Sequence, residues 1–203
     1  MRLRRVKPFL LALAGAPALW LWFAALTDRL GANPAEALIR GLGEWTLIML
    51  CLTLSITPLR QWTGRPEWAL LRRGLGLWSF AYAVQHFTVY LWLDMEWGLA
   101  QTWADVLQRP FILVGSLAVL LMLPLAATSF NGAVKRLGAT RWKRLHASVH
   151  LIAALALLHF FWMRSGKSDY ADVLFFALVL SLLWALRLLR RWKKSGSQTS
   201  SPS

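Results

Sequence analysis

The chain has 203 residues, of which 57% are hydrophobic and only 16% are charged. A soluble domain of this length has no interior large enough to bury so much apolar surface, so we interpret the chain as an integral membrane protein. The net charge of +14 does not indicate nucleic-acid binding, because the basic residues form clusters between apolar segments. The single cysteine, Cys51, excludes an internal disulfide and a multi-cysteine metal site, and we expect it to be a small buried residue.

Six segments are long and apolar enough to cross a hydrocarbon core of about 30 Å as helices. They cover residues 8–26, 41–59, 74–93, 110–128, 145–163 and 170–189. The second is expected to end near Pro58, which has no backbone N–H. The sequence therefore predicts an all-α, six-helix transmembrane bundle made by a single domain, residues 1–194. A serine-rich, disordered cytoplasmic tail is expected at residues 195–203.

The loops between these segments alternate in charge. The N-terminal leader and residues 60–73, 135–144 and 187–194 together hold 18 of the 23 Lys and Arg residues. The remaining loops carry most of the acidic residues. By the positive-inside rule the basic loops and both termini are predicted to be cytoplasmic, and the acidic loops are predicted to face the outside.

Four histidines lie inside or at the edge of the apolar segments, where ionisable side chains are costly and usually mark an ion path or a cofactor. Counted at 1.5 Å per residue from the cytoplasmic side, His86 and His159 lie about 18 and 21 Å deep, at one level toward the outside. Two parallel helices with imidazoles at matching depth can hold a haem iron between them. This pair is therefore the first candidate for haem ligation.

The other two histidines, His146 and His150, lie at the cytoplasmic edge and define a second level. On an ideal helix His146 and His159 would be about 140° apart, so ligation from both requires a local distortion or differently oriented haems. His150 is one turn from His146 and could substitute for it or hydrogen-bond near it. A helix-end histidine more often contacts a headgroup or a carbonyl. A haem-free scaffold or transporter, with the histidines in proton relay or packing, is an alternative.

Several short motifs occur in order along the chain. They are ITPLR (56–60), RRGLGLW (72–78) followed by His86, RPF (109–111), ATS (127–129), LG (137–138), RWKRLH (141–146) and HFFW (159–162). As a set, from about Leu30 to Lys194, they resemble the MsrQ (YedZ) family, bacterial members of the ferric reductase-like transmembrane family, which also includes the membrane domain of NADPH oxidases.

The resemblance implies a haem b electron-transfer subunit of the bacterial inner membrane, rather than a catalytic subunit. It implies electron transfer from quinol to MsrP, a periplasmic molybdenum-cofactor enzyme that reduces protein methionine sulfoxide. The implied iron ligands are His86, His146 and His159, with His150 as a possible accessory residue and one or two haems. The wider family's inner haem uses a further histidine 14 residues before His86, where this chain has Arg72.

The resemblance leaves the electron donor and a second cofactor open. Because no nicotinamide- or flavin-binding domain is apparent in the sequence, a separate cytoplasmic flavin reductase is an alternative to quinol. FMN has been associated with the family, and the basic run Arg141, Lys143 and Arg144 could hold its phosphate. A direct ferric or oxygen reductase of the same fold is a further alternative.

Overall fold

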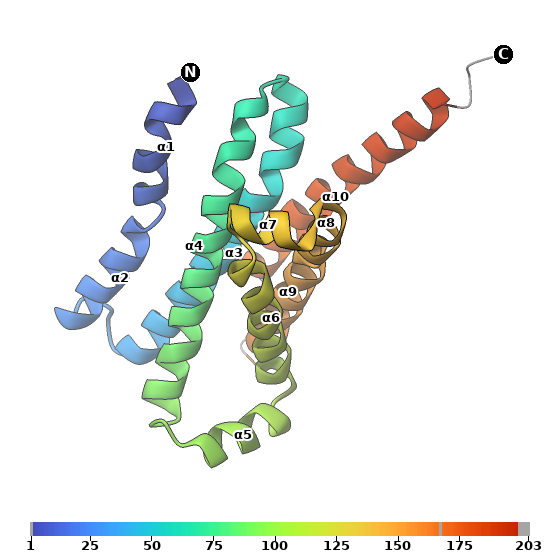
Figure 1. The fold of residues 1–203 in the computed structure, drawn as a ribbon. Coiled ribbons are helices and arrows are strands. Elements are labelled where there is room, and N and C mark those ends of the chain that lie inside the picture. Colours follow the sequence, from blue (N-terminus) through green and yellow to red (C-terminus); the bar gives the residue numbers. More distant parts are fainter. Residues whose placement is uncertain (1, 167, 199–203) are drawn as a thin grey trace.

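The computed structural model describes residues 2–166 and 168–198, and all of their regular secondary structure is helical (Figure 1). The elements in chain order are α1 (Arg2–Leu13), α2 (Ala16–Leu26), α3 (Pro34–Thr63), η1 (Pro66–Trp68), α4 (Ala69–Val89), η2 (Tyr90–Asp94), α5 (Leu99–Gln108), α6 (Pro110–Ala127), α7 (Asn131–Leu137), α8 (Ala139–Ala147), α9 (Val149–Ser165) and α10 (Ala171–Gln198). The tail expected from residue 195 begins inside α10, and residues 199–203 lie outside the described residues.

Within the described residues, five helical segments are long and apolar enough to cross a membrane. They are Leu3–Leu26, Pro34–Thr63, Pro110–Ala127, Ala139–Ser165 and Ala171–Arg190. The expected count of six is not confirmed, because α4 is not among them. Its polar residues lower its hydropathy, and some of them bond to neighbouring helices: Ser79 donates to the Thr46 carbonyl, and Gln85 accepts from Trp22 Nε1.

Helix α3 is longer than the expected segment 41–59 at both ends. Asn33 caps its start by accepting a hydrogen bond from the Glu36 amide, and Pro34 occupies the first turn, where its missing N–H costs nothing. The helix also continues through Pro58 to Thr63. The expected end at Pro58 is therefore wrong: surrounding helices can hold a helix together across the single hydrogen bond that a proline removes.

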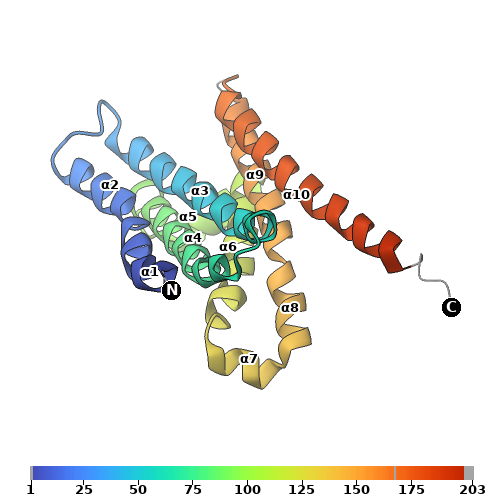
Figure 2. The same ribbon diagram turned by 90° about the horizontal axis from the view of Figure 1, so that it is seen from above.

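Four helices form two antiparallel pairs around the centre of the bundle. Helix α4 returns along α3, and α9 returns along α6 (Figures 1 and 2). Buried apolar side chains from these helices and from α10 pack into one core cluster. Its members include Leu50 of α3, Ala83 of α4, Met122 of α6, Ile152 of α9 and Leu180 of α10. The helices that carry the histidines are thus held at fixed distances by a shared core.

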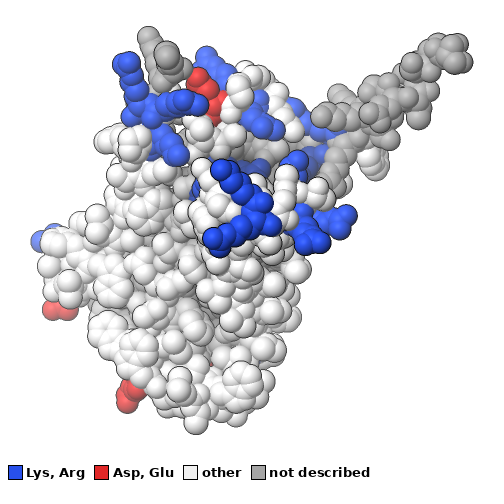
Figure 3. All heavy atoms as spheres, viewed as in Figure 1, with Lys and Arg blue, Asp and Glu red and all other residues white. Residues whose placement is uncertain are grey.

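The two ends of the bundle differ in charge. Lys and Arg side chains gather at the end where α1 begins and where α7 and α8 lie (Figure 3). At the opposite end α5 lies across the bundle instead of along it (Figure 1), and neither it nor α7 was expected from the sequence. The exposed large hydrophobic residues of α5 are Leu99, Trp103 and Leu107, spaced one turn apart along one face.

The first predicted span is broken into α1 and α2. In a continuous helix the Ala18 amide would donate to the Ala14 carbonyl, but the hydroxyl of Tyr82 lies between them. Tyr82 accepts from the Ala18 amide at 3.1 Å and donates to the Ala14 carbonyl at 2.8 Å. Because Tyr82 is completely buried, it satisfies both backbone groups at the break and fixes the first helices against α4.

Replacing Tyr82 with phenylalanine tests this role. Tyr82→Phe leaves two buried backbone groups without the hydroxyl, and we expect a loss of about 1–2 kcal/mol of stability. The corresponding fall in the thermal unfolding midpoint in detergent, followed by tryptophan fluorescence, is roughly 2–8 °C. Tyr170→Phe, which alters a ring stacked on Phe161, is the control. Equal midpoints for the two variants would contradict the assigned role of the Tyr82 hydroxyl.

Candidate cofactor-binding site

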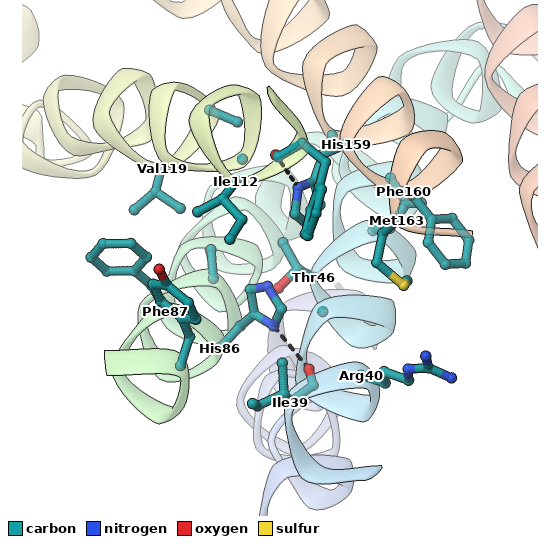
Figure 4. A pocket seen from close by; sticks show the side chains of 18 of the residues that line it. Ile39, Arg40, Thr46, His86, Phe87, Ile112, Val119, His159, Phe160 and Met163 are labelled. Carbon is teal, nitrogen blue, oxygen red and sulfur yellow. Dashed lines mark hydrogen bonds between the residues drawn. The ribbon is translucent and has the colours of Figure 1, made fainter. Parts of the chain in front are cut away.

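A cavity of about 380 Å³ lies between the two helix pairs, within the size range of small-molecule sites. Its walls come mainly from α3, α4, α6 and α9, and Figure 4 shows part of the lining. Most of the lining is apolar. The apolar residues of the wall include Leu47, Leu50, Ala83, Val119, Met122, Ile152, Ala156 and Phe160. A few polar groups converge on this space, which is the usual composition of a cofactor site.

His86 of α4 and His159 of α9 lie side by side in this cavity, as their equal depth predicted. Their ring centroids are 6.1 Å apart and their planes meet at 79°. Two metal–nitrogen bonds of about 2 Å and two ring radii of about 1 Å would place the centroids of opposed imidazole ligands about 6 Å apart. At this separation both side chains could hold one metal ion between them.

Each of these rings is oriented by a main-chain carbonyl of the facing helix. His86 Nδ1 lies 2.8 Å from the carbonyl oxygen of Ile39 in α3, and His159 Nδ1 lies 2.6 Å from that of Phe111 in α6. A carbonyl oxygen only accepts, so both Nδ1 atoms carry the proton and donate. In the neutral imidazole Nε2 then holds the free lone pair, which is the state in which histidine binds a metal.

Two buried polar atoms point to a group that would complete the cavity. Among the described residues, Ser116 Oγ and Arg164 Nε are the buried side-chain nitrogen or oxygen atoms without a hydrogen-bond partner. Both residues line this cavity. Unsatisfied buried polar groups are rare, and each usually marks a ligand, a water or an ion. The residues therefore fit a cofactor with an apolar body, a metal and some polar substituents.

Three arginines line the cavity toward the end of the bundle where α5 lies. We call this the acidic end, because Glu36, Asp94 and Asp105 lie there. Arg40 pairs with Glu36, and Arg109 Nε lies 2.9 Å from Asp105 Oδ1. In each pair the carboxylate is four residues before the arginine. Arg164 binds two carboxylates, one in the α9–α10 connection and one in the first turn of α10. These are Asp169 at 3.2 Å and Asp172 at 2.8 Å.

Asp94, an exposed residue at the end of η2, also lines this end of the cavity. Partial burial of its carboxyl group raises its pKa, Arg109 opposes the rise, and Asp105 adds to it. The acidic end of the cavity thus contains both guanidinium groups and a carboxyl group whose charge is disfavoured.

His146 lies outside this cavity, on α8. Its Nε2 is 3.0 Å from the Thr128 hydroxyl, and its ring stacks on Trp142 with centroids 4.0 Å apart. The predicted single helix 145–163 is in fact divided at Ser148 between α8 and α9. The structure thus keeps His146 at the basic end of the bundle, separate from the pair formed by His86 and His159.

His150 also lies outside the large cavity, at the start of α9. Its Nδ1 accepts a hydrogen bond from Trp184 Nε1 at 3.1 Å, and its Nε2 contacts Arg187. Both neighbours belong to α10. The side chain therefore joins α9 to α10, and the structure does not bring it to the other histidines.

Sequence reasoning missed the three cavity arginines and the parts of the site that do not ionise. The carbonyl acceptors belong to Ile39 and Phe111, whose side chains carry no signal for this role. Gly43 and Gly115, one turn further along the same helices, also line the cavity. Glycine inside an apolar helix is unfavourable and usually has a packing or functional reason, so these two residues were the available signal.

Comparisons with known proteins agree with this architecture. A family model described as "Ferric reductase like transmembrane component" matches residues 41–158, which include most of the cavity wall. Several relatives carry the name protein-methionine-sulfoxide reductase heme-binding subunit MsrQ. One from Polaromonas naphthalenivorans is 48% identical over 194 residues, covering 96% of this chain and 89% of the relative.

Two further relatives with this name are similar over almost the same length. The protein from Herminiimonas arsenicoxydans is 46% identical, covering 95% of this chain and 88% of the relative. The protein from Ralstonia nicotianae is 44% identical with the same coverage, 95% and 88%. No solved structure matches the chain. The sequence similarity, the apolar helices and the paired histidines lead to one conclusion: the chain belongs to the ferric reductase-like transmembrane family and, within it, to the MsrQ proteins.

Proposed function

We propose that this chain is a haem b-binding electron-transfer subunit of a methionine sulfoxide reductase system. The observation that carries the proposal is the pairing of His86 and His159 across the cavity, each with Nδ1 directed at a backbone carbonyl. The relatives' names describe a haem-binding subunit of such a reductase, which supports the same assignment. The chain would supply electrons to a catalytic partner and would not itself bind the oxidised methionine.

The residues of the cavity would hold haem b in the following way. His86 and His159 would present their Nε2 atoms to the iron, and the apolar wall would exclude water. Arg40, Arg109 and Arg164 would face the carboxylates of the porphyrin. Haem supplies one-electron transfer, and its potential is set by ligand identity, hydrogen bonds and burial. The backbone carbonyls that fix the rings are therefore part of what would set the potential.

A second haem and FMN, both expected from the sequence, are further parts of the proposal. His146 is proposed as a ligand of a second haem at the basic end, with His150 as an accessory residue and Arg72 at the position where the wider family has a histidine. FMN is proposed only on family likeness. The exposed basic run on α8 that would meet its phosphate consists of Arg141, Lys143 and Arg144.

We propose a multi-pass orientation in the bacterial inner membrane with both termini in the cytoplasm and α4 as the sixth span. The gathering of basic residues at one end of the bundle supports this orientation (Figure 3). Electrons would enter from quinol, or from a cytoplasmic flavin reductase, and would leave toward a periplasmic molybdenum-cofactor reductase of the MsrP type. The outer position of the His86–His159 pair suits delivery to a partner on that side.

Substitution of the paired histidines tests the haem assignment. We expect the detergent-purified wild type to show b-type bands in the reduced-minus-oxidised visible spectrum. His86→Ala and His159→Ala should each abolish the outer haem, because one axial ligand and its orienting hydrogen bond are lost. Gln101→Ala, at an exposed position on α5 outside the cavity, is the control. Full haem content in both cavity variants would refute the assignment, and a colourless wild type would favour the haem-free scaffold.

The orientation can be tested by cysteine labelling. Cys51 is only 8% exposed and can be replaced by serine to give a cysteine-free background. In that background Gln101→Cys on α5 should react with a membrane-impermeant maleimide in intact spheroplasts. Arg65→Cys, between α3 and η1, should react only after lysis. Both positions are exposed in the folded chain. The opposite pattern would show that the basic end faces the periplasm.

The acceptor separates the proposed function from a direct reductase of the same fold. We expect chemically reduced protein to be reoxidised by an MsrP-type enzyme supplied with methionine sulfoxide, and only slowly by ferric chelate or by oxygen. The rate of bleaching of the reduced haem band measures each reaction. Fast reoxidation by ferric chelate without the partner enzyme would instead support a ferric reductase.

A further inference from the structure

The two cavity histidines are held by the same local device on two different helices. His86 bonds to the carbonyl of Ile39 and lies against Gly43, four residues later on α3. His159 bonds to the carbonyl of Phe111 and lies against Gly115, four residues later on α6. In both cases the acceptor and the glycine are one helical turn apart. Figure 4 shows the two rings and their hydrogen bonds.

Helix geometry explains why glycine is needed at that spacing. The carbonyl of residue i points along the helix axis toward residue i+4, whose side chain lies on the same face. That carbonyl already accepts the amide of residue i+4, and its second lone pair is reached from the side. Without a Cβ at i+4, an imidazole can enter the groove and donate to the second lone pair.

The distances show that a side chain at either glycine would crowd the histidine ring. A Cβ atom on Gly115 would lie 2.6 Å from His159 Nδ1 and 2.9 Å from its Cε1, which is closer than such atoms approach. A Cβ atom on Gly43 would lie 3.1 Å from both Nδ1 and Cε1 of His86. Alanine at either position would therefore push the ring away from its carbonyl, and more strongly at Gly115 than at Gly43.

Other glycines in the described helices have different neighbours. A Cβ on Gly41, also in α3, would lie 2.8 Å from Leu21 Cδ2, and a Cβ on Gly74 would meet Leu11. A Cβ on Gly76 would lie 3.7 Å from Thr53 Cγ2, an ordinary contact. Among the described glycines, Gly43 and Gly115 are thus the ones whose Cβ position has a histidine ring as its nearest neighbour.

We propose that Gly43 and Gly115 are positioning residues that set the tautomer and ring orientation of His86 and His159 for binding haem iron through Nε2. The proposal rests on the haem-binding function proposed above. Each glycine acts through its histidine: the open groove admits the ring, and the carbonyl takes the Nδ1 proton. The hydrogen bond from Nδ1–H to a carbonyl also increases the electron-pair donation from Nε2 to the metal, and this would stabilise oxidised iron.

The test compares Gly43→Ala and Gly115→Ala with Gly41→Ala and Gly76→Ala in the full-length, haem-loaded protein. The readouts are haem per chain, the electron paramagnetic resonance spectrum of the ferric state and the midpoint potential. Gly115→Ala should weaken haem binding about tenfold or more, in the range found for lost orienting partners of metal ligands. Gly43→Ala should retain haem with altered resonance positions and a higher potential. Both controls should match the wild type.

Gly41→Ala is the matched steric control, because its Cβ contact at 2.8 Å lies between those at Gly115 and Gly43 but is made with a leucine. Wild-type spectra and potentials in both Gly43→Ala and Gly115→Ala would overturn the proposal. Equal disturbance by Gly41→Ala would do the same, since the effect would then be one of helix packing. If Gly115→Ala does not accumulate, the spectrum and potential of Gly43→Ala decide the question. A wild type without haem would instead refute the proposed function itself.

Discussion

The arrangement of the bundle depends on one requirement: two imidazole rings in an apolar interior need acceptors for their Nδ1–H groups. Both acceptors are main-chain carbonyls, of Ile39 and Phe111. Because these oxygens belong to helices, their positions are fixed by the backbone and do not depend on the rotamer of another side chain. The requirement ties α4 to α3 and α9 to α6. The cavity lies between the two pairs that result.

The division between α8 and α9 separates two environments for histidine. On one continuous helix His146 and His159 would point in directions about 140° apart. The break at Ser148 removes that constraint and leaves His146 beside Thr128 and Trp142, at the end of the bundle where basic residues gather. His159 remains in the apolar wall. The two residues therefore experience different polarity, and any redox centres at the two levels would differ in potential for that reason.

The sequence allowed the apolar helices and the common depth of His86 and His159 to be predicted, because both follow from hydropathy and helical rise. It did not allow the break in the first span to be predicted, since the hydroxyl that fills it comes from Tyr82, more than sixty residues away. The span count depended on α4, whose polar residues lower its hydropathy and in part bond to other helices. The acceptors of the site are backbone atoms and leave no mark in composition. In the sequence, Gly43 and Gly115 were the features that pointed to these carbonyl acceptors.

The charges around the cavity determine how an anionic cofactor would be oriented inside it. Arg40 and Arg109 are each paired with a carboxylate one turn away, and Arg164 is paired with Asp169 of the α9–α10 connection and with Asp172 in the first turn of α10. Such local pairs hold the guanidinium groups in place without linking one cavity helix to another. A guanidinium has five N–H donors, so a local carboxylate leaves donors for a further anion. Because the wall beyond the arginines is mainly apolar, a cofactor with carboxylate groups would be most stable with those groups at the arginine end and its apolar edge toward the core.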